Sequence, residues 1–85
     1  MGLPYPLAII YCLRGDVYAK LDEPIKAIDD YTRAIEINPE YANAYFNRGL
    51  AYAHLGQYQK AIDNFNRAIE LNPKFADAYG GRGVV

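Results

Sequence analysis

The sequence repeats itself with a period of 34 residues, and this period restricts the fold more than any other feature of the chain. The pattern Tyr-x-x-Arg-Gly begins at Tyr11, Tyr45 and Tyr79. Residues 11–44 align with residues 45–78 without a gap, and 18 of the 34 positions are identical. A repeat of this length is typical of proteins in which copies of one small unit stack side by side.

Within each copy, the apolar residues follow a helical period. In the second copy, Tyr45, Gly49 and Tyr52 lie on one stripe of a helix that Gly56 ends. A second helix follows and ends before Pro73, because the residue that precedes a proline is pushed out of helical geometry.

The first copy has the same organisation. We expect one helix at about residues 7–21, a turn at Asp22 and Glu23, and a second helix over residues 24–37. Pro24 suits the first turn of that helix, where its missing N–H group is harmless. The sequence therefore predicts an all-α chain with two antiparallel helices in each copy.

Small residues recur where helices must approach closely. We expect Gly49 to face the partner helix near Ala61, and Gly15 to face Ala27 in the same way. Ala34 comes late on the second helix of the first copy, where the next copy must pack.

The recurring residues resemble the tetratricopeptide repeat, whose pattern is W-x2-L-G-x2-Y…A-x3-F…P. The matching residues are Tyr45, Arg48, Gly49, Tyr52, Ala61, Phe65 and Pro73 in the second copy, and Tyr11, Arg14, Gly15, Tyr18, Ala27, Tyr31 and Pro39 in the first. In both copies a tyrosine replaces the tryptophan and an arginine replaces the leucine. The copies differ at the first turn, where Asp22 and Pro24 stand in place of Gly56 and Tyr58. The geometry of that turn is left open.

The resemblance implies an all-α, tetratricopeptide-type helix-turn-helix solenoid. It implies one domain over residues 1–85, with repeats at residues 8–41 and 42–75 and the first helix of a truncated third repeat at residues 76–85. The glycine-rich tail belongs to this third copy, because a phosphate-binding loop needs a preceding strand and a following Lys-Ser or Lys-Thr pair.

Composition excludes several classes of function. The 85 residues carry a net charge of −1 with both signs interspersed, which predicts no nucleic-acid partner and no basic patch for a membrane. The longest apolar run, residues 7–13, is too short to span a bilayer. Cys12 is the only cysteine, so no internal disulfide and no cysteine-based zinc cluster can form. We therefore expect a cytoplasmic, reduced setting.

No pair of residues predicts catalysis. The chain has no serine, and Cys12 and His54 are separated by about 12 Å along the helix axes of the expected fold, which is too far for a dyad. A lone histidine near a helix end caps carbonyl groups or faces water more often than it binds metal. The carboxylates expected to form a solvated face are Asp29, Asp30, Asp63 and Glu70. We expect no enzymatic activity, metal or cofactor.

Beside the packing stripe, the first helices carry a second apolar stripe. At about 100° per residue, Phe46, Leu50 and Ala53 lie well away from Tyr45. In tetratricopeptide proteins this face of the first helices lines a concave groove that holds a peptide, so the resemblance implies a binding site here. Its candidate residues are Ile9, Cys12, Asp16, Asn43, Phe46, Asn47, Leu50, Ala53 and His54. The alternative is that Phe46 and Leu50 only pack against neighbouring first helices.

The resemblance also allows one class of ligand to be tested. Some members of the family hold the C-terminal carboxylates of heat-shock chaperones with a clamp of lysine, asparagine and arginine side chains. Here only Asn47 fits that clamp, and Asp16 and Asp77 carry the opposite charge. An acidic tail is therefore a poor ligand, and we expect a protein or peptide partner that offers an apolar or mixed helix.

A second interpretation is purely structural. In it, the chain is a spacer or self-associating segment of a larger repeat protein and has no ligand of its own. Repeat stacks need about three units and polar terminal faces, whereas residues 7–13 are apolar on nearly every side. We therefore expect a homo-oligomer, most simply a dimer.

Overall fold

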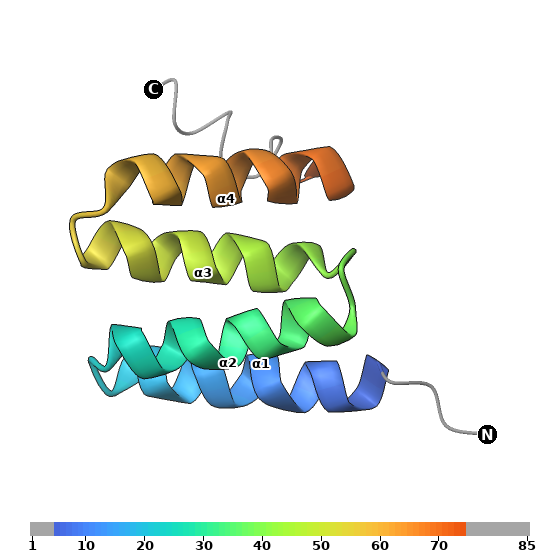
Figure 1. The fold of residues 1–85 in the computed structure, drawn as a ribbon, viewed down its shortest axis with the longest axis horizontal. Helices are drawn as coiled ribbons and strands as arrows, with labels where there is room; N and C mark the ends of the chain where they lie inside the picture. Colours follow the sequence, from blue (N-terminus) through green and yellow to red (C-terminus); the bar gives the residue numbers. More distant parts are fainter. Residues whose placement is uncertain (1–4, 75–85) are drawn as a thin grey trace.

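The computed structural model describes residues 5–74, which form four α-helices and no strand. The helices are α1 (Tyr5–Lys20), α2 (Pro24–Ile37), α3 (Ala42–His54) and α4 (Tyr58–Leu71). Figure 1 shows them stacked with each helix antiparallel to the next, and with α2 in front of α1. α1 packs mainly on α2 and α3 mainly on α4, while α2 and α3 join the two pairs. The predicted all-α helix-turn-helix solenoid is confirmed.

The two helical pairs correspond to the two copies of the sequence repeat. α3 and α4 lie within the expected repeat at residues 42–75, and α1 begins three residues before the expected repeat at residues 8–41. The expected third repeat at residues 76–85 lies outside the described residues. The boundaries of the repeats stay a prediction.

Both turns inside the repeats end the first helix with a residue in the left-handed conformation. The φ angle is 62° at Asp22 and 79° at Gly56. The next amide, that of Glu23 or Gln57, donates a hydrogen bond of 2.9 Å to the carbonyl oxygen five residues earlier. Asp22 thus takes the place of the glycine despite the cost that a β-carbon imposes in this conformation. The turn that the sequence left open has the same geometry in both repeats.

Two glycines allow each first helix to approach an aromatic ring of its partner. A β-carbon at Gly15 would lie 2.7 Å from Cε1 of Tyr31, and one at Gly49 would lie 2.6 Å from Cε1 of Phe65. The predicted close approach is therefore present in both repeats. At Gly49 the expected neighbour is present, because the carbonyl oxygen of Ala61 lies 3.2 Å from the β-carbon position. At Gly15 the three nearest atoms belong to the Tyr31 ring and none to Ala27.

Small side chains make up most of the interior. The buried apolar residues in the described part of the chain are Ala8, Cys12, Ala27, Tyr31, Ala34, Ala44, Phe46, Ala51, Ala61 and Ala68. Tyr31 is the one large side chain in residues 5–74 that is fully buried. Ala34 of α2 and Ala44 of α3 belong to one cluster and are both inaccessible to solvent. The two repeats can therefore pack closely at this point, as expected for Ala34.

Each repeat also contains a polar contact between its first and second helices. Nε and Nη2 of Arg14 donate to the two carboxylate oxygens of Asp30, at 2.8 and 2.9 Å. In the second repeat, Nε of Arg48 donates to Oδ1 of Asn64 at 2.7 Å, and its Nη1 donates to Thr32 at 3.2 Å. Asp30 is only 3% exposed, so its expected place on a solvated face was wrong. The buried carboxylate is instead neutralised by Arg14; the other three carboxylates of that expectation are exposed.

Candidate functional site

An open groove of about 690 Å³ lies between α1 and α3. These two helices make few direct contacts with each other, since α2 packs against both. The residues that line the groove are Leu13, Asp16, Val17, Ala19, Lys20, Pro24, Tyr31, Asn47, Leu50, Ala51 and His54. Leu13, Val17 and Leu50 are 58%, 56% and 49% exposed. The groove therefore has an apolar wall that solvent reaches.

A single carboxylate joins three helices at the base of the groove. Oδ1 of Asp16 on α1 accepts hydrogen bonds from the Tyr31 hydroxyl on α2, at 2.6 Å, and from Nδ2 of Asn47 on α3, at 3.0 Å. Burial raises the pKa of Tyr31, and the hydrogen bond to Asp16 raises it further. The hydroxyl therefore remains protonated at neutral pH and keeps its bond to Asp16, which fixes α1 relative to both neighbours.

Basic side chains lie at one end of the groove. Nε2 of His54 and Oδ1 of Asp22 are 2.8 Å apart, and this contact links the end of α3 to the turn between α1 and α2. Lys20, in the last turn of α1, also lines the groove. Both members of the His54 contact are exposed, so it contributes little to stability. Because the Asp22 carboxylate lies beside His54, Lys20 is the cation that this end of the groove offers to a ligand.

The groove contains part of the predicted set of site residues. Four of the nine candidates line it: Asp16, Asn47, Leu50 and His54. Ile9 and Asn43 are exposed but lie outside the lining, and Ala53 is half-buried outside it. Ile9 is one of several apolar side chains of α1 that solvent reaches beyond the groove.

Two predicted site residues lie in the interior. Cys12 and Phe46 are 3% and 9% exposed, so they are not the exposed anchors that we expected. The Phe46 ring packs against Phe65 of α4 with the ring centroids 5.3 Å apart. Cys12 belongs to the core between the repeats, and burial raises the pKa of its thiol. Each first helix is covered by its own partner and by the neighbouring repeat, so only part of the second apolar stripe reaches solvent.

Leu13, Val17 and Tyr31 line the groove but were absent from the predicted set. A signal for the first two existed in the repeat, because they stand 34 residues before Asn47 and Ala51, which line the same groove. Tyr31 gave no such signal. It occupies the aromatic position of the second helix, and nothing in the sequence shows that its hydroxyl reaches the groove.

The described residues form neither a metal site nor a catalytic Cys–His dyad. Within residues 5–74, no three His, Cys, Asp or Glu side chains come close enough to hold a metal ion. Cys12 lies in the core and His54 at the exposed end of α3, so neither can activate the other. In the same part of the chain, no helix combines the length and the apolar composition that crossing a membrane requires.

Two antiparallel helical pairs, stacked with a groove beside their first helices, define a helical-repeat protein of the kind that binds other proteins. A sequence model of the tetratricopeptide repeat matches residues 42–75, and a second, described as a TPR repeat, matches residues 26–56. The chain belongs to the tetratricopeptide repeat family.

The crystal structure of MamA has a similar fold. The two are 36% identical in sequence with a TM-score of 0.80, and the match covers 89% of this chain and 48% of MamA. The chain thus spans about half the length of MamA. Tetratricopeptide repeats are in general non-enzymatic modules for protein interaction, and at this level the chain is a protein-interaction scaffold.

Proposed function

We propose that the chain binds a helical or extended segment of a partner protein in the groove between α1 and α3. The observation that carries the proposal is the groove wall. Leu13 and Val17 of α1 and Leu50 of α3 are exposed apolar side chains that face one open space. Apolar side chains that converge on a groove are the usual anchors for an amphipathic segment.

Charges around the groove favour a segment of mixed polarity. The carboxylate of Asp16 is already engaged by two hydrogen bonds at the base, whereas Lys20 places a cation at one end of the groove. An amphipathic helix that buries its apolar face on Leu50 and places an acidic side chain near Lys20 matches both features. A purely acidic tail lacks the apolar face and remains the poorer ligand.

Selection of binding peptides from a random displayed library provides the test. The affinity of a selected peptide is measured for the parent chain and for Leu50→Asp and Ile62→Asp. Leu50 and Ile62 are 49% and 48% exposed, so the same change is made on the groove wall and on α4 outside the groove. We expect Leu50→Asp to weaken binding about tenfold or more and Ile62→Asp to have little effect. Equal affinities for the two variants would contradict the proposal.

A second candidate function is self-association through the outer face of α1. Ile10, which lies outside the groove, is 59% exposed, whereas the equivalent residue of α3, Ala44, is 0% exposed. This face adjoins the groove at Val17, which is 56% exposed. No helix among residues 5–74 covers this face of α1. An apolar face of this kind favours association of two copies in a homodimer.

Sedimentation equilibrium at micromolar concentration tests this second candidate. We expect twice the chain mass of 9.6 kDa for the parent and the single mass for Ile10→Asp. Ile62→Asp serves as the control and should remain dimeric. The melting temperature of the parent should rise with protein concentration. A monomer at every concentration would exclude self-association, and a dimer that survives Ile10→Asp would exclude this face.

A further inference from the structure

The two repeats differ at one polar position, and the difference leaves a cation without a counter-charge. In the first repeat, Arg14 forms an ion pair with Asp30 at 2.8 Å. In the second repeat, Asn64 stands 34 residues after Asp30 and contacts Arg48. Arg48 forms no ion pair with any residue in the described range 5–74. Its positive charge is therefore not neutralised within this part of the chain.

Asn64 does not replace the carboxylate fully. Its Oδ1 accepts from Nε of Arg48 at 2.7 Å, but its Nδ2 is a donor and bonds to the carbonyl oxygen of Lys60 at 2.8 Å. Nη1 of Arg48 donates to Thr32. Nη2, the group that in Arg14 bonds to a second carboxylate oxygen, has no acceptor among residues 5–74. One arm of the guanidinium fork is thus available to an external acceptor.

A second guanidinium lies on the same tyrosine ring. The Cζ atom of Arg48 is 5.4 Å from the centroid of the Tyr45 ring, and that of Arg67 is 5.9 Å from it. Arg67 pairs with Glu70 at 3.1 Å, but these side chains are 47% and 66% exposed, so the pair is weak and exchanges readily with other anions. With Glu70 counted, the two arginines leave a net local charge of about +1, which attracts an anion.

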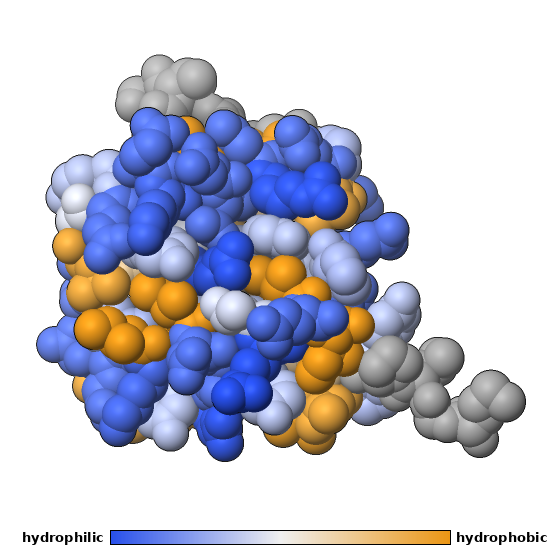
Figure 2. Space-filling view, viewed as in Figure 1, coloured by the Kyte–Doolittle hydropathy of each residue, from blue (hydrophilic) through white to orange (hydrophobic). Residues whose placement is uncertain are grey.

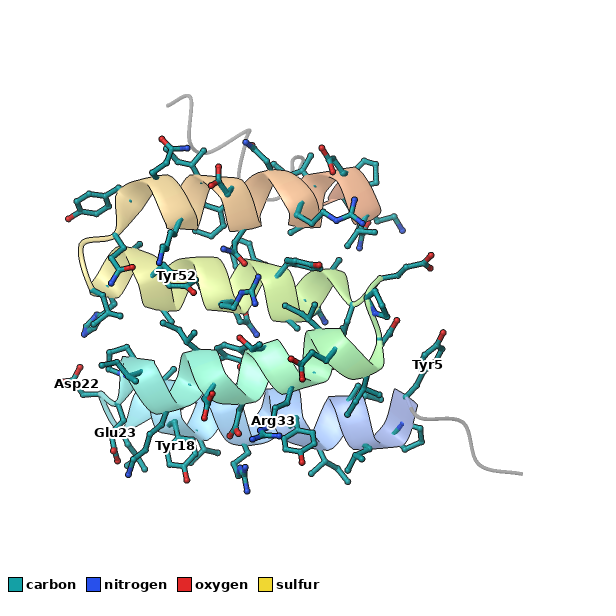
Figure 3. The ribbon with its side chains drawn as sticks, in the orientation of Figure 1. Tyr5, Tyr18, Asp22, Glu23, Arg33 and Tyr52 are labelled. Carbon is teal, nitrogen blue, oxygen red and sulfur yellow. The ribbon has the colours of Figure 1, made fainter. Side chains whose placement is uncertain are left out.

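This cluster lies away from the groove. Because a helix turns by about 100° per residue, Arg48 lies about 160° around α3 from Leu50, which lines the groove. Arg48 contacts Thr32 of α2 and Asn64 of α4, so it lies between the two second helices. Figure 3 views this face, on which Tyr52 follows Arg48 by about one turn. In Figure 2, hydrophilic side chains cover the upper and lower parts of the same face, and a broken band of hydrophobic side chains crosses its middle.

We propose that Arg48 and Arg67 form a binding site for a carboxylate carried by an acidic side chain of a partner protein. The ligand accepts a hydrogen bond from Nη2 of Arg48 and takes the charge-neutralising role that Asp30 has in the first repeat. Arg67 exchanges its exposed contact with Glu70 for the ligand. The first repeat has no such site, because its carboxylate is internal.

The site is separate from the groove, so the proposal does not depend on the function proposed for the groove. A partner that follows the surface between α2 and α4 could place an acidic residue on Arg48 while the groove remains open or occupied. The two repeats provide a matched pair, in which Arg14 is the occupied arginine and Arg48 the available one.

Nuclear magnetic resonance tests the proposal, because the Nε–Hε resonances in nitrogen–proton correlation spectra report each arginine separately. Acetate serves as the probe, since it carries the same carboxylate group as an acidic side chain. The full 85-residue chain is titrated with acetate in place of chloride at constant ionic strength. We expect a saturable shift of the Arg48 resonance and no shift of the Arg14 resonance. Asn64→Asp supplies an internal carboxylate and should weaken acetate binding at Arg48 at least about tenfold. The reverse change, Asp30→Asn, should make Arg14 respond.

Equal responses of Arg14 and Arg48 overturn the proposal, as does a response of Arg48 that survives Asn64→Asp. Asn64→Asp only recreates the contact that the first repeat already contains, so the test does not depend on whether Asp30→Asn folds. Arg67→Gln should weaken acetate binding severalfold, and unchanged affinity would overturn the two-arginine site. A short peptide with one glutamate should bind, and its glutamine counterpart should not; equal binding by both would contradict a carboxylate site.

Discussion

Adding one methyl group to either of two equivalent glycines should have different consequences in the two repeats. Gly15→Ala would place a β-carbon 2.7 Å from the Tyr31 ring, and Gly49→Ala would place one 2.6 Å from the Phe65 ring. Both distances are shorter than a carbon–carbon contact allows, so each ring must move. At Gly49 the β-carbon would also lie 3.2 Å from the carbonyl oxygen of Ala61, which requires a smaller shift than the ring does. What holds the ring in place therefore decides most of the cost of the substitution.

Alanine is more favourable than glycine inside a helix by about 1 kcal/mol, and overpacking costs about 1–3 kcal/mol. Tyr31 is 1% exposed and its hydroxyl bonds to Asp16 at 2.6 Å. Its ring cannot withdraw without straining a hydrogen bond that contributes about 1 kcal/mol. Phe65 is half-buried and has no polar group to anchor it. We expect Gly15→Ala to lower the free energy of unfolding by about 2 kcal/mol, and Gly49→Ala to change it by less than about 1 kcal/mol.

Urea unfolding at one fixed protein concentration, followed by far-ultraviolet circular dichroism, measures both free energies. Tyr31→Phe is the control variant, because it removes the hydrogen bond to Asp16 that holds the ring in place. In that background the ring has lost its bond to Asp16, so Gly15→Ala should cost about 1 kcal/mol less than in the parent. The reasoning is refuted if Gly15→Ala is no more destabilising than Gly49→Ala, or if its cost is the same with and without the hydroxyl of residue 31.

Asp22→Gly should raise the free energy of unfolding by about 0.5–1 kcal/mol, because glycine adopts the φ of 62° without a β-carbon penalty. The contact with His54 that is lost is exposed and contributes little. A lower urea midpoint for the variant would contradict this prediction. Stability should fall at alkaline pH. Burial, and then the proximity of Cys12, raises the pKa of Tyr41 from 10.0 to about 12, and burial raises the pKa values of Tyr31 and Cys12. These groups hold their protons more tightly when folded, so their contribution is complete below the unfolded pKa values of about 9–10 and is lost as the pH rises toward 12. Tyr41→Phe should flatten that decline, and unfolding free energies that do not change between pH 9 and 12 would argue against it.

The helices could be predicted because single residues determine where they begin and end. α2 has the expected bounds, Pro24–Ile37, since proline fixes its first turn and the pair Asn38-Pro39 stops it. Gly56 ends the first helix of the second repeat as expected. Each of these effects depends on one or two neighbouring residues, so it can be recognised from the sequence alone.

The groove and the buried polar contacts were harder to predict because they depend on how helices are placed relative to one another. Cys12 and Phe46 belong to the same predicted stripe as Leu50, but a helical period does not show which part of a stripe a neighbouring helix covers. Asp30 resembled a surface residue for a similar reason. Its partner, Arg14, lies 16 residues away on another helix, and the periodicity of one helix contains no information about that contact.

One departure from the family pattern is coupled to a polar contact between helices. The pattern has a leucine where this chain has Arg14 and Arg48. An arginine beside a helix–helix interface requires a polar partner on the facing helix, and Asp30 and Asn64 provide it. The arginine in each repeat is therefore matched by a polar residue on its second helix.

A second coupled difference separates the two repeats at the groove. In the first repeat, Asp16 accepts a hydrogen bond from Tyr31. The residues 34 positions later are Leu50 and Phe65, so both members of the polar pair become apolar together. A carboxylate next to a phenylalanine ring would lose its hydrogen bond, and a buried tyrosine hydroxyl next to leucine would have no acceptor. For that reason the two residues of each pair differ together between the repeats. The groove therefore has a carboxylate on α1 and an exposed leucine on α3. A segment bound there, as we propose, meets different chemistry on its two sides, which favours one orientation of an amphipathic helix over the other.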